Sequence, residues 1–228
     1  MLEERITGLK RDIVEYAGLV EGMIAKSIAG LLEKRPDVLG EVIERDEPRA
    51  NSFEIEIDDA CTSLIAQFQP KARELRTILM IMQMDNDFER IGDHAVNIAE
   101  SGIYLIERPQ LKPYIDIPRM ADITRGMLRD GITAFVNEDA ALARNVCERD
   151  STVDSLRVQI LRELITFMAA DPATIERCLH LIRVSGNLER VADLSTNMAE
   201  DVIFMVEGRV IKHHHDDGAP GGEGIKAR

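Results

Sequence analysis

Carboxylate side chains recur at the same spacing in two segments of the chain. Glu89 and Asp93 are four residues apart in the first segment, and Glu189 and Asp193 are four apart in the second. At about 100° per residue, Glu89, Asp93 and Glu100 fall within roughly 40° of one another on a helix. Hard cations bind such surfaces, where carboxylates from neighbouring turns are completed by amide oxygens and water. The same asparagine and glutamate follow each pair: Asn97, Glu100, Asn197 and Glu200.

Two interpretations of these acidic residues stand side by side. In the first, each segment holds a metal ion, with Glu89 and Asp93 or Glu189 and Asp193 as the first ligands and the asparagines and later glutamates in support. In the second, the acids form an ordinary solvated helix face, neutralised by the arginine that follows each first glutamate. Like charges one turn apart cost about 0.2–0.5 kcal/mol, and a merely solvated face has no need to repeat them. An all-oxygen ligand set does not select among Mg, Mn and Fe.

The two segments are copies of one another. Residues 85–101 align with residues 185–201 without a gap, and the Glu, Arg, Asp, Asn, Ala and Glu of the motif are identical at the aligned positions. An internal duplication is the simplest explanation. In each copy, apolar residues alternate in steps of four and three, a period of about 3.5 that predicts a helix lying nearly parallel to its neighbours in a bundle. The predicted seams are Met84, Phe88, Ile91, Ala95, Ile98, Gly102 and Leu105, and Val184, Leu188, Val191, Ser195, Met198, Val202 and Met205.

The rest of the chain predicts long amphipathic helices around these two. No segment shows sustained alternation with β-branched residues, so we expect no strands. Pro48 removes a backbone donor inside the second helix, which predicts a kink or a restart near Asp46. Asn137 is a candidate cap for the fifth helix. The expected helices are 3–33, 36–68, 71–107, 118–136, 138–170 and 172–207, with 109–117 as the joint between halves.

The order helix, helix, motif helix therefore occurs twice. We predict an all-α protein of two tandem three-helix bundles, with residues 1–109 as the first repeat and 110–208 as the second. Residues 209–228 have no apolar periodicity and are expected to be a disordered tail. Whether the two bundles stack end to end or side by side does not follow from the pattern.

Composition excludes several classes of function. The net charge of −13 and the absence of a Lys/Arg block argue against nucleic-acid binding. Three cysteines, an odd number without paired spacing, predict buried free thiols. The N-terminus is charged from its third residue and no apolar run approaches about 18 residues, so we expect a cytoplasmic protein. No nucleophile beside a base, no Gly-rich phosphate loop and no Glu-x-x-His pair is present, and we therefore predict that the protein is not an enzyme.

One histidine adjoins the first motif. His94 follows Asp93 and could turn towards the same site, but Leu194 occupies the equivalent position in the second copy. A structural, hydrogen-bonding role is therefore favoured for His94 over metal ligation.

The first motif resembles the signature of a known family. Residues 87–100, DFERIGDHAVNIAE, resemble the signature of the PhoU family, the phosphate-transport regulators of bacteria. Residues 188–193 and 197–200 are similar to its second copy, with Ala192 and Leu194 in place of the Gly and His of the first. The second copy keeps its carboxylates but lacks any histidine contribution. The similarity extends over about residues 3–207 in helix order and length.

The resemblance implies more than the residues alone. Members of this family have two three-helix bundles and usually form dimers, and their Glu-x-x-x-Asp motifs bind iron, zinc, magnesium or manganese, often in clusters. They are negative regulators that reach the membrane only through their partners. When phosphate is plentiful they contact the ATPase subunit of the phosphate ABC transporter and a phosphate-sensing histidine kinase, and phosphate-starvation genes stay off. The expected function is therefore a metal-binding adaptor between transporter and kinase.

Two other functions remain as alternatives. The first is an accessory subunit of a low-affinity phosphate carrier, since related domains occur with such carriers. The second is a metal-dependent hydrolase or oxidase built on the carboxylates, for which histidine ligands and a base are missing.

Overall fold

The chain folds as a bundle of long helices. The structure, a computed structural model, describes residues 1–207, and these contain no strand. A short helix α2 (Pro36–Glu41), a π-helical turn η1 (Val42–Asp46) and a 3₁₀ turn η2 (Pro172–Thr174) adjoin the long helices. The long helices are α1 (Leu2–Glu33), α3 (Glu47–Phe68), α4 (Arg73–Ile106), α5 (Asp116–Asn137), α6 (Ala140–Ala170) and α7 (Ile175–Glu207). The all-α prediction is confirmed, whereas the predicted disorder of 209–228 lies outside the described residues.

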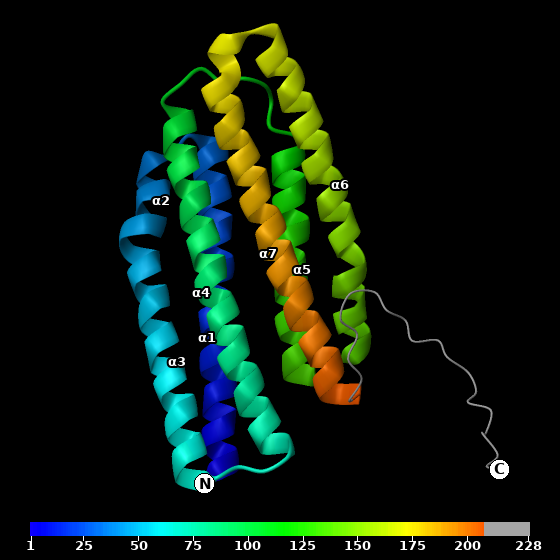
Figure 1. Ribbon diagram of the computed structural model, residues 1–228. Coiled ribbons are helices and arrows are strands. Elements are labelled where there is room, and N and C mark those ends of the chain that lie inside the picture. The colour runs from blue at the N-terminus through cyan, green and yellow to red at the C-terminus, as the bar shows by residue number, and fades with distance from the viewer. Residues whose placement is uncertain (208–228) are drawn as a thin grey trace, which may run out of the picture.

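The two halves lie side by side. Helices α1, α3 and α4 pack together, as do α5, α6 and α7, and the halves meet where α4 lies along α7 and α1 along α5. Figure 1 shows α4 and α7 in the middle, with α1 and α5 behind them and α3 and α6 at the outer edges. The boundary drawn between residues 109 and 110 falls in the connection from α4 to α5. The two bundles therefore pack side by side and not end to end, which the apolar periodicity alone does not determine.

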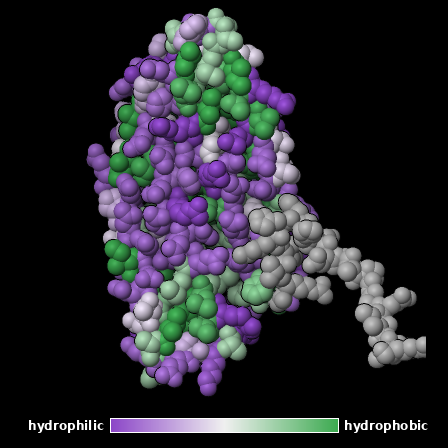
Figure 2. All heavy atoms as spheres, viewed as in Figure 1, coloured by the Kyte–Doolittle hydropathy of each residue, from purple (hydrophilic) through white to green (hydrophobic). Residues whose placement is uncertain are grey.

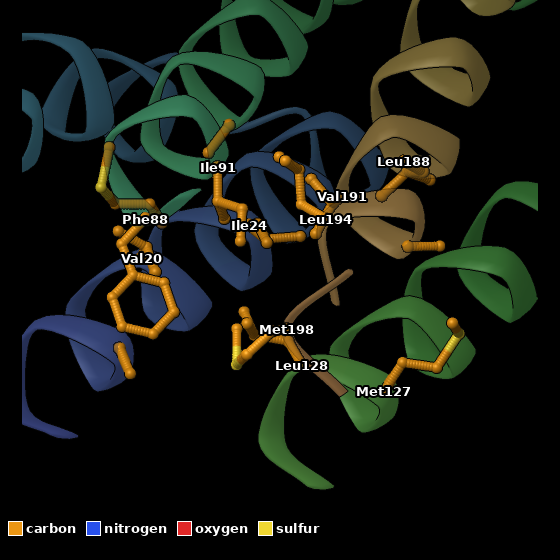
Figure 3. Close-up of a cluster of buried hydrophobic side chains, with 14 of the residues drawn as sticks. Val20, Ile24, Phe88, Ile91, Met127, Leu128, Leu188, Val191, Leu194 and Met198 are labelled. Atoms are coloured by element: carbon orange, nitrogen blue, oxygen red, sulfur yellow. The ribbon is translucent and has the colours of Figure 1, made fainter. Parts of the chain in front are cut away.

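Both halves share one hydrophobic core. The predicted seam of α4 is fully buried, and so is that of α7 except for the partly buried Met205. Figure 3 shows side chains of the first half, such as Ile24 and Ile91, in one cluster with Val191 and Leu194 of the second. All three cysteines are free thiols, with Cys61 and Cys178 buried and Cys147 partly buried. The interior therefore joins the two repeats into one folding unit.

The predicted irregularity near Asp46 is present as the π-helical turn η1. When the two repeats are aligned, Asp46 of the first matches Asp150 of the second, an offset of 104 residues. After the turn, the buried Ile57 matches the buried Ile160, an offset of 103. The first half therefore has one extra residue in its second helix. A π-helical turn accommodates a single inserted residue within an otherwise continuous helix. Pro48 sits in the first turn of α3, where its missing N–H disturbs the helix least.

Two local expectations were wrong. Asn137 does not cap the fifth helix, because it is the last residue of α5; instead, Asp139 accepts bonds of 3.0 Å from the backbone N–H groups of Ala141 and Leu142. Helix α5 also begins at Asp116, two residues before the proline expected to open it. Both are shifts of one or two residues at a helix end, where spacing along the chain locates boundaries least well.

The surface is polar across the middle of the face formed by α4 and α7. Figure 2 shows hydrophilic side chains there and hydrophobic ones towards both ends. Exposed apolar residues occur near both ends of these helices, among them Leu79 of α4 and Ile175, Leu179 and Phe204 of α7. No helix within residues 1–207 is long and apolar enough to cross a membrane.

Truncating a side chain between the halves tests the shared core. Leu194 is 2% exposed and lies between the halves. We expect Leu194→Ala to lower the free energy of unfolding by about 2–5 kcal/mol, because it leaves a cavity. Thermal unfolding followed by circular dichroism should remain a single transition at a lower temperature. Leu179→Ala, at a position 54% exposed on the same helix, should change stability by less than about 0.5 kcal/mol. Two separate transitions would contradict a common core.

Candidate functional site

Each predicted acidic face lies beside the second helix of its own half. The first acidic face consists of Glu89 and Asp93 on α4 together with Glu54 on α3, whose charge raises the pKa of Glu89. The second consists of Glu189 and Asp193 on α7 together with Asp154 on α6, which acts on both in the same way. Glu89, Glu189 and Asp193 are thus partly buried beside a neighbouring helix, whereas Asp93 is exposed.

The charge of the first acidic face is only partly compensated, because Arg90 lowers the pKa of Glu89 from a distance without forming an ion pair with it. Burial, followed by the charges of Asp93 and Glu54, raises the pKa of Glu89 above its ordinary value. Arg90, which could have neutralised the face, turns instead to Asp87, with Nη1 3.9 Å from Oδ1. Within residues 1–207, no Lys or Arg nitrogen lies within 4.0 Å of a carboxylate oxygen of Glu54, Glu89 or Asp93.

A buried carboxylate adjoins this face. Asp85 precedes Glu89 by one helical turn, is 2% exposed, and its Oδ1 has no hydrogen-bond partner within residues 1–207. Burial and then the charges of Glu54 and Asp58 raise its pKa to about 7. The hydroxyl of Tyr16 is likewise buried without a partner in this part of the chain, and the negative charge of Asp85 helps to raise its pKa. An unpaired buried carboxylate is costly unless a proton or a cation joins it.

The second acidic face is neutralised from within. Arg157 of α6 donates from Nη1 to Oε1 of Glu189 at 3.1 Å, and the Glu189 side chain is 12% exposed. Arg190 donates from Nη1 to Oδ2 of Asp193 at 3.2 Å, and its Nε lies 3.9 Å from Oε2 of Glu189. Burial still raises the pKa of both carboxyl groups. The arginine pairs are those of the solvated-face interpretation, whereas Oε2 of Glu189 is buried without a hydrogen-bond partner within residues 1–207.

The supporting residues do not all join these pairs. Glu100 and Asn197 are exposed, while Asn97 and Glu200 are partly buried. Each later glutamate is seven residues beyond its aspartate, about 10 Å along the helix axis, and Glu200 acts on Cys147 of α6 by raising the pKa of that thiol. Within residues 1–207 no three His, Cys, Asp or Glu side chains form a group that could hold a metal ion. The eight-residue ligand assignment therefore stays a prediction.

His94 has the structural role that its position favours. Its Nδ1 lies 2.8 Å from Oδ1 of Asn187, so the ring links α4 to α7 between the halves. Asn187 donates its amide N–H to the backbone oxygen of Arg183, which leaves Oδ1 as an acceptor for the imidazole. Burial lowers the pKa of His94, so the neutral ring is the form that packs here.

Sequence reasoning missed several residues at or beside these faces, among them Asp85, Glu54 and Arg157. Asp85 lies on the acidic side of α4, one turn before Glu89, but its counterpart in the second copy is Ser185, so the duplication does not mark it. Glu54 and Arg157 belong to other helices, and only packing places them beside the motif.

The donors of the first face are all carboxylate oxygens, which fits a hard cation such as Mg²⁺ or Mn²⁺.

The buried Asp85 should make stability depend on pH. Its raised pKa means that the folded protein holds a proton that the unfolded chain releases, so this stability is complete below about pH 4 and is lost as pH rises through about 7. Asp85→Asn keeps the site neutral. In EDTA we expect the variant to exceed the parent protein in unfolding free energy by up to about 3 kcal/mol at about pH 8, and by much less at about pH 4. Urea denaturation at both pH values measures this.

The control is Asp59→Asn, which removes an exposed carboxylate of α3. It should show no such difference between the two pH values. An equal effect of Asp85→Asn at both pH values would mean that folding does not raise the pKa of Asp85.

Comparisons with known proteins match the whole described bundle. The PhoU domain model matches twice, at residues 13–102 and 117–202. A phosphate-specific transport system accessory protein PhoU homolog of Aquifex aeolicus is 40% identical over 90% of this chain and 93% of its own length. Its counterpart in Deinococcus radiodurans is 37% identical over 91% of this chain and 97% of its own.

A solved structure agrees with the sequence comparisons. The crystal structure of PhoU from Pseudomonas aeruginosa superimposes with a TM-score of 0.88 at 32% identity, covering 92% of this chain and 100% of that one. With both repeats matched, the relatives aligned over nine-tenths of the chain and the fold shared, this chain belongs to the PhoU family.

Proposed function

We propose that this protein is a regulatory accessory protein of a phosphate transport system. The observation that supports this most strongly is the match of both repeats to the PhoU domain, together with relatives named as phosphate-specific transport system accessory proteins that align over nearly their full length. The functional site is then a pair of binding faces on a rigid helical scaffold, and regulation proceeds by contact with other proteins.

The finer part of the proposal concerns the partners. The protein acts as a homodimer at the cytoplasmic side of a phosphate ABC transporter, touches the ATPase subunit, and holds a phosphate-sensing histidine kinase in its inhibitory state. A stiff bundle with a single core suits an adaptor, because it can hold two partners at a set separation without internal motion. The exposed apolar residues at both ends of α4 and α7 offer two separate contact areas on one face.

A bound cation is the third part of the proposal. The first acidic face has the donor chemistry for Mg²⁺, Mn²⁺ or iron, with Glu89 and Asp93 as ligands. Glu54 lies nearby, as does Asp85, whose Oδ1 has no hydrogen-bond partner within residues 1–207. Such a cation would draw α3 and α4 together and remove the repulsion among these acids. It would stabilise the bundle without any chemical reaction.

Association with the transporter is tested in the cell. When phosphate is plentiful, affinity purification of this protein from solubilised membranes should recover the ATPase subunit and the kinase, identified by mass spectrometry. Deleting its gene should raise the expression of phosphate-starvation genes in phosphate-rich medium, and the intact gene should restore repression. Recovery of a low-affinity carrier without the ABC transporter, with unchanged gene expression, would refute the adaptor role.

Metal content tests the cation. We expect a variant with Glu89, Asp93, Glu189 and Asp193 all replaced by Ala to retain less Mn²⁺, Mg²⁺ or iron per chain than the parent protein, because the carboxylate ligands are gone. Inductively coupled plasma mass spectrometry after equilibrium dialysis measures this. A control with the same change in net charge replaces four exposed acids elsewhere: Glu3, Glu33, Glu44 and Glu148. Equal metal content in all three proteins would remove the site from these residues.

A further inference from the structure

An exposed apolar surface lies on the outer side of α6 and α7. Its residues, here called the outer apolar patch, are Val158, Leu161 and Ile165 of α6 and Ile175 and Leu179 of α7, each 38–54% exposed. Single apolar side chains on a surface need no explanation, whereas several gathered in one place mark a contact site. Figure 2 shows hydrophobic side chains gathered at the end where η2 joins these two helices.

The packing of α6 against α7 brings the two parts of the patch together. The helices run antiparallel from η2 (Figure 1), and further along the pair Arg157 donates to Glu189 at 3.1 Å. Ile165 precedes the turn by about as many residues as Leu179 follows it, so the two lie at nearly the same level. The α6 members also lie on the side of their helix from which Arg157 reaches α7, at about 100° per residue.

The α6 members have the spacing of a second helical seam. Val158, Leu161 and Ile165 follow one another in steps of three and four, and the partly buried Met168 continues with a step of three. This outer seam lies about 120° around α6 from the buried seam of the same helix. Alternating steps of three and four are typical of a helix that packs against another helix on that side. Helix α6 therefore presents one seam to the core and a second one outward.

The first half lacks this surface. After the π-helical turn, α3 and α6 correspond at an offset of 103 residues, so Asp58 stands in the place of Leu161 and Thr62 in the place of Ile165. Both are exposed. Because the first half folds with polar residues at these places, the shared architecture does not require apolar ones. The outer apolar patch is therefore a feature of the second half that the fold itself does not explain.

The exposed charges beside the patch are positive. Arg162 of α6 and Arg183 of α7 are exposed, and neither guanidinium forms an ion pair within residues 1–207. Asp59 and Gln83 stand in their places in the first half. In a chain of net charge −13, this surface combines apolar side chains with unpaired arginines. It is complementary to a partner that is apolar and acidic.

Charge distinguishes among the possible occupants. A second copy that pressed the same patch against itself would bring arginines together, and the acids beside the patch are engaged elsewhere: Glu163 pairs with Lys112, and Glu176 accepts from the hydroxyl of Tyr104 at 2.6 Å. A membrane of anionic lipids attracts arginines but repels a chain of net charge −13. A helix with acidic residues beside an apolar seam matches both the spacing and the charge.

We infer that the outer apolar patch is the docking surface for an amphipathic helix of a partner protein, whose apolar residues recur in steps of three and four and whose flanking acids pair with Arg162 and Arg183. The inference rests on the proposed function, because it assigns a surface to one contact of an accessory protein. The partner helix lies over α6 and α7 and covers the outer seam as the core covers the inner one. Only the second half provides this contact.

Photo-crosslinking of the full chain in cells locates the partner helix. Leu179→benzoylphenylalanine places a photoreactive side chain in the patch, and Ile55→benzoylphenylalanine places one at an exposed position of α3 as the control. Cells grown with plentiful phosphate are irradiated, and the linked peptides are sequenced by mass spectrometry. We expect adducts from position 179, and none from position 55, on one amphipathic acidic helix of one protein. Adducts on a second copy or on a segment of other character, or no adduct, would overturn the inference.

Residues of the first repeat supply matched variants for a binding assay. A synthetic peptide of the crosslinked helix is titrated with the full chain by fluorescence anisotropy. Leu161→Asp/Ile165→Thr should weaken binding at least about tenfold, and Arg162→Asp about threefold with a smaller salt dependence. The reciprocal control Asp58→Leu/Thr62→Ile should bind as the parent protein does. All variants should keep the melting temperature of the parent, because the substituted residues are exposed. Unchanged binding in Leu161→Asp/Ile165→Thr would refute the docking surface.

The outcomes separate this inference from the proposed function. If Leu161→Asp/Ile165→Thr still recovers the transporter and the kinase as the parent does, the proposed function stands and the inference fails. If the parent recovers neither, the proposed function fails, while a position-179 adduct on an acidic amphipathic helix of another protein would still support the surface. Flotation of the parent, but not of this variant, with vesicles of phosphatidylglycerol and phosphatidylcholine would assign the patch to a membrane and overturn the inference.

Discussion

The packing of α4 against α7, over a core that both halves share, is the constraint on which the rest of the structure depends. Burying the apolar seam of each motif helix sets the rotation of that helix about its axis. Once Phe88 and Ile91 point inward, Glu89 must lie at the edge facing α3, and Asp93 is exposed one turn further on. The same argument directs Glu189 and Asp193 towards α6. Burial of the apolar seam thus positions the charged residues, although the charged residues contribute nothing to the free energy of that burial.

The electrostatics of the two faces depend on the second helix of each half. A carboxylate held at the edge of a core needs a proton, a side-chain cation or an ion. The second half uses Arg157 and Arg190. In the first half Arg90 pairs with Asp87 and acts on Glu89 only from a distance, while Glu54 adds a negative charge. A duplicated scaffold allows this divergence, because both halves bury the seam of their motif helix in the same way while the residues at the edge differ.

The π-helical turn Val42–Asp46 shows how the first half preserves that edge. An extra residue in an uninterrupted α-helix would turn everything after it by about 100° about the axis. The wider turn absorbs the residue, so that Ile57 and Cys61 still face the core. Glu54 consequently stays on the side of α3 that looks towards the motif helix. A small irregularity of the backbone therefore determines whether a carboxylate reaches the first acidic face.

The sequence by itself determined the helices, the duplication and the residues that are buried, because each depends on local periodicity that a single helix must satisfy. The two seams, the helix order and the outward placement of the motif acids all follow from spacing within one element. The structural role of His94 could be anticipated but its partner Asn187 could not, since the two residues are on different helices. Only the tertiary structure decided that the halves lie side by side, that Asp139 and not Asn137 caps α6, and that Arg157 meets Glu189 while Glu54 meets Glu89. The physical reason is that charge compensation depends on which side chain another helix places within hydrogen-bonding distance, and spacing along one helix contains no information about its neighbours. The cap depends instead on the residue at which α6 begins, which the nearby Asn137 and Asp139 leave open in the sequence.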